Sequence, residues 1–102
     1  MEKNIIVLKN FIDYQLGSVV SKEIMKTENG TVTLFAFDKG QGLSEHTAPF
    51  NVLALIIDGQ AEVKIDKTPY TVAEGQMIEL PVGKPHSLKA LKQFKMLLIM
   101  IK

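Results

Sequence analysis

Two histidines, His46 and His86, are the side chains in this sequence best suited to chemistry. Each lies near glycine and proline, at the expected edge of a strand. An imidazole can act as an acid or base, as a hydrogen-bonding group or as a ligand of a divalent metal. The two positions are too far apart for a local chelate on one helix. Only the fold can bring them together, so the elements that carry them decide their role.

The composition is that of one globular domain with a hydrophobic core. The chain has 102 residues, of which 46% are hydrophobic and 23% are charged. The net charge of +1 gives no field that favours nucleic acid or an anionic membrane. All positive residues are lysine, so the guanidinium fork that usually grips phosphates is missing. We therefore expect no nucleic-acid partner.

The absence of cysteine excludes disulfides, thiolate zinc sites and cysteine nucleophiles. Any metal chemistry would use nitrogen and oxygen ligands. The first eleven residues contain no apolar run of signal-peptide length, and no stretch approaches the length of a membrane span. We expect a cytoplasmic protein that does not enter a membrane.

Turn signals recur along the chain and separate short apolar or alternating runs, which is typical of an all-β fold. A single helical pattern lies near the start, where Leu8, Phe11 and Ile12 have helical spacing before Gly17. The sequence therefore predicts antiparallel strands with one short N-terminal helical turn. The turn signals are Asn29-Gly30, Lys39-Gly40, Asp58-Gly59, Lys67 to Pro69, Glu74-Gly75 and Pro81 to Pro85.

Two of these signals predict hairpins. Residues 19–26 and 31–37 flank Asn29-Gly30, a pair that suits a tight turn. Residues 51–57 and 61–65 flank Asp58-Gly59-Gln60 in the same way. The second arm alternates between apolar and polar residues, which predicts one buried face and one solvated face.

Two runs, residues 52–57 and 96–101, are apolar at consecutive positions, so both faces of those strands favour burial. One explanation is that loops or the N-terminal segment cover the second face. The other is a homodimer that buries it, and closed two-fold dimers are the commonest assembly. We favour the homodimer.

The stretches around both histidines resemble the two motifs of the cupin superfamily. The second motif is present in full, as Gly75, Pro81, Gly83 and His86 at the family's spacing. The first motif matches at its start, with Gly40 and His46, and at its end, with Gly59. The resemblance covers roughly residues 30 to 102.

This resemblance implies a double-stranded β-helix, a jelly-roll barrel of antiparallel strands, in agreement with the strand and turn pattern. It divides a single barrel domain, residues 1–102, into an N-terminal part and a barrel. Residues 1–29 would form a strand, the short helix and a further strand, and residues 30–102 the barrel.

The middle of the first motif departs from the family pattern. Cupins usually present a second histidine and a glutamate there, where this chain has Ala48 and Val52. Two of the four usual ligands, His46 and His86, remain. Two imidazoles hold a divalent ion such as Zn, Fe, Mn or Ni weakly. Asn51 or Gln41 is the candidate third donor if a break at Pro49 shifts the alternation of the strand.

Three functions are compatible with these residues. The first is a small-molecule-binding module with a reduced two-histidine site in the barrel. The second is a metal-dependent enzyme that resembles the dioxygenases, isomerases and decarboxylases of the superfamily. The third is a structural, dimeric interaction protein. We favour the module, and the expected ligand-binding residues are His46, His86, Ala48, Val52, Met77 and Met96.

Overall fold

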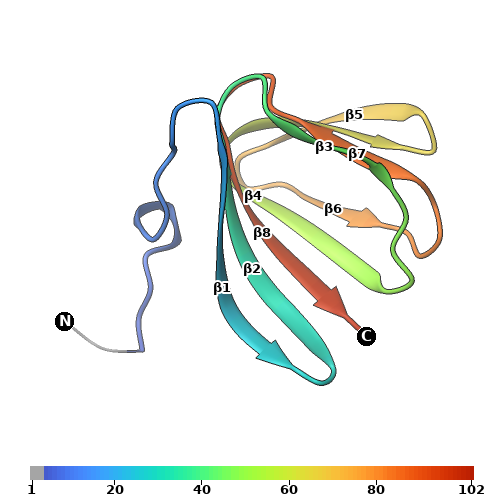
Figure 1. The fold of residues 1–102 in the computed structure, drawn as a ribbon, viewed down its shortest axis with the longest axis horizontal. Coiled ribbons are helices and arrows are strands. Elements are labelled where there is room, and N and C mark those ends of the chain that lie inside the picture. The colour runs from blue at the N-terminus through green and yellow to red at the C-terminus, as the bar shows by residue number, and fades with distance from the viewer. Residues whose placement is uncertain (1–3) are drawn as a thin grey trace.

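The computed structural model describes residues 4–102 and consists mainly of antiparallel strands (Figure 1). The predicted all-β fold with a short N-terminal helical turn is confirmed. None of the helical structure in residues 4–102 has the length and apolar character that a membrane crossing requires. The elements are the 3-10 turn η1 (Leu8–Asn10) and the strands β1 (Val19–Thr27), β2 (Gly30–Phe37), β3 (Gly42–His46), β4 (Asn51–Ile65), β5 (Thr68–Ala73), β6 (Met77–Leu80), β7 (His86–Lys89) and β8 (Phe94–Ile101).

The strands form two sheets that share β4. The first half of β4 pairs with β8 and β6, and the sheet continues through β2 to β1. The second half pairs with β7 and β5, and β3 adds to β7. The two sheets face each other around one core, with β3, β7 and β5 opposite β8 and β6 (Figure 1). This is the predicted jelly-roll barrel.

The predicted hairpin at Asp58-Gly59-Gln60 is wrong, because β4 runs through it without reversing. Gly59 has a φ of 76°, and the pairing with β8 shifts register between Ile56 and Asp58. The positive φ and the bulge therefore bend the strand from one sheet into the other. The chain reverses later, at Asp66 and Lys67, whose φ angles of 50° and 72° form a two-residue turn into β5.

The predicted hairpin of β1 and β2 is confirmed, with Thr27 opposite Gly30. Gly30 already belongs to β2 and does not have a positive φ, so the turn conformation does not explain why a glycine is needed here. A Cβ there would lie 2.3 Å from the carbonyl oxygen of Met100 on β8. Gly30 is thus required by the close approach of two strands.

The main core fills the space between the sheets. Phe37 and Phe94 stack there with their ring centroids 4.4 Å apart. The inward residues of β4 and β8 alternate with outward ones, as a period of two requires. The buried members of this core are Phe37, Val52, Ala54, Ile56, Ala61, Val63, Val72, Leu80, Leu88, Ala90, Phe94 and Met96.

The N-terminal segment covers one end of the outer face of the β1-β2-β8-β4-β6 sheet. Ile12 is buried there against Leu34 and Ala36. The Tyr14 hydroxyl donates to Asp58 Oδ2 at 2.7 Å, which fastens the segment to the bend of β4. One end of the second apolar face is therefore covered within the chain, as the first explanation predicted.

The other end of this face remains uncovered in the single chain. Met25, Val32, Ile99 and Leu53 stand opposite one another in register across β1, β2, β8 and β4. Ile101, on the same face of β8, is 52% exposed. The outward apolar side chains of β4 and β8 are thus covered over only part of the sheet.

Candidate functional site

The fold brings His46 and His86 into contact. The two residues are opposite each other in the β3–β7 pairing, and their Nε2 atoms are 3.1 Å apart. The rings meet edge to face, with an interplanar angle of 69°. His86 is buried, with 4% of its surface exposed, whereas His46 lies at the surface.

Local turn chemistry positions both rings. Gly83 adopts a φ of 75° in the turn between β6 and β7, and its N–H donates to the carbonyl oxygen of Ala48 at 3.0 Å. This hydrogen bond ties the loop before His86 to the loop after His46. A register shift between Leu43 and His46 aligns the end of β3 with the start of β7.

The backbone assigns the protonation of the imidazoles, because a carbonyl oxygen can only accept. His46 Nδ1 lies 2.9 Å from the Ser44 oxygen, and His86 Nδ1 lies 3.3 Å from the Lys84 oxygen. Each Nδ1 therefore carries a hydrogen and donates it. Both Nε2 atoms then face each other as acceptors, unless one ring takes up a second proton and donates to its partner.

Burial lowers the pKa of His86, and the neighbouring charge on His46 lowers it further. The hydrogen bond to Lys84 acts in the opposite direction. His86 therefore favours the neutral form, with Nε2 free to accept a hydrogen bond.

The two imidazoles close one side of a cavity of about 40 Å³ between the sheets. The rest of its wall is hydrocarbon or thioether. This volume accommodates one water or the polar end of a small molecule. The lining residues are Leu43, His46, Ala48, Val52, Leu80, His86, Leu88, Leu98 and Met100.

Four of the predicted ligand-binding residues, His46, His86, Ala48 and Val52, thus lie around one cavity. The two predicted methionines do not line it. Met77 alternates outward on β6 and is 58% exposed, in a separate depression beside Tyr70. Met96 is fully buried deeper in the core, on the face of β8 that also carries Leu98.

Neither candidate third donor lines the cavity. Asn51 is an exposed residue at the start of β4, and the alternation that points Val52 inward points Asn51 outward. Gln41 lies in the turn before β3, where its N–H donates to Asp38 at 3.0 Å and its carbonyl accepts from Ala90 at 2.8 Å. Neither residue is placed to complete a metal shell with the histidines.

The leucines of the cavity wall are not among the ligand-binding residues predicted from the sequence. Strand alternation does predict Leu88, because it lies two residues after His86 on β7 and therefore points to the same side. The opposing wall comes from other strands, with Leu80 on β6 and Leu98 on β8. Their convergence depends on how far the sheets separate, which a local pattern does not encode.

The donor set does not fit a tightly held catalytic metal. Within residues 4–102, no group of three or more histidine, cysteine, aspartate or glutamate side chains is placed to hold an ion. Catalytic zinc sites normally have three protein ligands, and this cavity supplies two imidazoles.

Comparison with known proteins assigns the family. The family model described as Cupin domain matches residues 33–102. The chain belongs to the cupin family. Among curated proteins, no sequence matches this cupin.

Solved structures resemble this cupin over most of its length. A conserved protein of unknown function from Streptococcus pyogenes is 33% identical, with a TM-score of 0.93 over 100% of this chain and 90% of that one. A cupin 2 conserved barrel domain protein from Leptotrichia buccalis is 36% identical, with a TM-score of 0.86 over 89% of this chain. This cupin spans 44% of that protein.

The structures of the same fold include an enzyme. Salicylate 1,2-dioxygenase from Pseudoaminobacter salicylatoxidans is 13% identical, with a TM-score of 0.76 over 81% of this chain and 26% of that one. At this identity the likeness concerns the fold, which hosts many unrelated functions.

Proposed function

We propose that this cupin is a cytoplasmic, homodimeric module that binds a small, partly apolar molecule at the histidine cavity. One observation carries the proposal: two Nε2 acceptors 3.1 Å apart stand at a cavity whose other walls are apolar. A hydroxyl group or an amide N–H would donate to Nε2, while methyl groups pack against Ala48 and Val52. The size of the cavity means that it holds one end of the ligand.

The test uses isobutanol and isobutyramide as probes, since each combines a branched apolar body with one polar group that can donate a hydrogen bond. We expect saturable changes in the imidazole NMR signals of His46 and His86. Ala48→Leu fills the cavity and should abolish them. Thr47→Ser, a change at an exposed neighbour of His46 that does not line the cavity, is the matched control and should leave binding unchanged.

The alternative function is a metal-dependent enzyme. Its support is that both Nδ1 atoms are turned toward backbone carbonyls, which leaves the lone pairs of two Nε2 atoms 3.1 Å apart available. Metal analysis of untagged protein decides between the two. Near-stoichiometric Fe, Mn, Ni or Zn that is lost in His86→Ala would overturn the module. Metal-free protein that binds the probes supports the binding module. Metal-free protein that binds neither probe overturns the binding module.

A further inference from the structure

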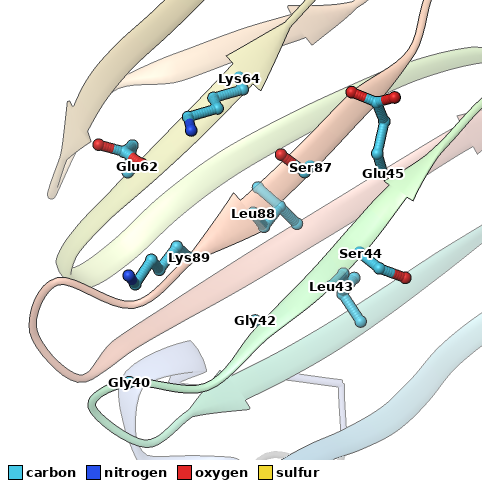
Figure 2. A pocket seen from close by; sticks show the side chains of 10 residues that line it. All are labelled: Gly40, Gly42, Leu43, Ser44, Glu45, Glu62, Lys64, Ser87, Leu88 and Lys89. Carbon is cyan, nitrogen blue, oxygen red and sulfur yellow. The ribbon is translucent and has the colours of Figure 1, made fainter. Parts of the chain in front are cut away.

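A second depression lies over β3, β7 and the second half of β4 (Figure 2). Leu88 of β7 points into the core, whereas its neighbours Ser87 and Lys89 point outward. The depression has a volume of about 460 Å³. This lies within the range of roughly 300–1,000 Å³ typical of small-molecule sites.

The floor of this groove is backbone and one short side chain. Gly42 stands opposite Lys89 in the pairing of β3 with β7. A Cβ on Gly42 would lie 2.2 Å from the carbonyl oxygen of Leu88, so a larger residue does not fit there. Ser87 contributes a hydroxyl group in the middle of the groove (Figure 2). The floor can therefore approach a ligand closely and offer it a hydrogen bond.

The walls are charged and come from three strands (Figure 2). Glu62 and Lys64 point outward from β4, and Lys89 stands opposite Glu62 in register. Glu45 lies across the groove on β3, where the pairing with β7 shifts register. Two carboxylates and two ammonium groups thus surround the floor.

These four charges have no ion-pair partner within the part of the chain that the structure describes. The ion pairs found in residues 4–102 join Lys9 to Asp58 and Glu74, at a different face. The charges of the groove sum to zero. A polyanion would be repelled by the glutamates and a polycation by the lysines, so the complementary ligand carries one charge of each sign.

We propose that this groove binds small zwitterions of the amino-acid and dipeptide class. The wall formed by β4 and β7 carries Lys64, Lys89 and Glu62 and so has a net charge of +1, and the ligand carboxylate lies toward its two lysines. The ammonium group of the ligand lies toward Glu45 on the opposite side, and Ser87 hydrogen-bonds its polar middle. Because exposed ion pairs are weak, the dissociation constants are on the order of millimolar. This site is independent of the function proposed for the histidine cavity.

The first experiment is an NMR titration of the amide signals of the whole protein with alanylalanine. We expect saturable shifts at Gly42, Ser87 and Lys89. N-acetyl-alanylalanine lacks the positive charge and alanylalaninamide lacks the negative one, so each should bind about two- to fivefold more weakly. Equal affinity for a singly charged analogue, or no saturable shift with the dipeptide, overturns the proposal.

The second experiment removes one charge of the groove at a time. Lys89→Met keeps the aliphatic stem and should weaken alanylalanine binding about two- to fivefold. Lys92→Met, at an exposed lysine outside the groove, is the matched control and should change nothing. Glu45→Gln provides a second variant if the first one perturbs the fold. Unchanged affinity in every folded groove variant overturns the proposal.

Discussion

His46 and His86 touch each other but differ in their surroundings. His86 is buried against leucine side chains, and burial together with the charge of its neighbour lowers its pKa. His46 lies at the surface. The pair therefore combines a buried acceptor inside the cavity with an exposed ring at its mouth.

This difference predicts a pH dependence of stability. The pKa of His86 is lower in the folded protein than the ordinary value of 6.5, so the unfolded chain binds its proton first as the pH falls. The contribution of neutral His86 to the free energy of unfolding is therefore fully present above pH 6.5 and is lost as the pH falls below this value. Urea unfolding of the wild type at a series of pH values should show a decreasing free energy of unfolding below this point. In His86→Gln this decrease should be smaller, and parallel pH profiles for both proteins would contradict the prediction.

At the residue scale, the sequence was informative where a side chain sits beside a strong turn signal. Pro81, Gly83 and Pro85 indicate the turn before His86, and the cupin motif spacing pairs it with His46. Met77 was harder to place, because an apolar residue in a short edge strand can face either way. Its orientation follows from the register of β6 against β4, which depends on distant parts of the chain.

Among the elements, β4 determines the architecture, because it belongs to both sheets. The bend of β4 at Gly59 sets the angle between the two sheets. One sheet contains β7 with His86, and the other contains β8. A glycine with positive φ occurs in hairpin turns and in bulges alike, so the local sequence could not distinguish a bend from a reversal. The close packing of Gln93 against Gly59 decides between them, and Gln93 is distant in sequence.

Replacing Gly59 should therefore lower the free energy of unfolding by more than the strain of a positive φ alone. In Gly59→Ala, the added Cβ would lie 1.8 Å from the backbone carbonyl oxygen of Gln93. We therefore expect a loss of about 2 kcal/mol or more in the free energy of unfolding. Gly40→Ala is the matched control: Gly40 has a φ of 87° and nothing within 4 Å of the added Cβ, and should cost about 1 kcal/mol. Chemical denaturation measures both, and equal losses would contradict a steric role for Gly59.

On the scale of the whole molecule, three surfaces carry different chemistry. The mouth between the sheets presents the histidines, and the outer face of the β3-β7-β4-β5 sheet presents the charged groove. The outer face of the opposite sheet is apolar beyond the N-terminal segment, around Ile99 and Ile101. A homodimer formed through this last surface would leave the other two accessible.

The dimer can be tested at a single exposed side chain. Ile101 is 52% exposed on the uncovered end of the apolar sheet face, and a stable dimer buries roughly 800 Å² per partner. A lysine there would place a charge inside the contact, so Ile101→Lys should shift the protein from dimer to monomer in sedimentation velocity at micromolar concentration. Val82→Lys is the matched control, because Val82 is equally apolar and 50% exposed but lies in the turn between β6 and β7. A wild type that sediments as a monomer, or an Ile101→Lys variant that stays dimeric, would show that this face does not join two copies.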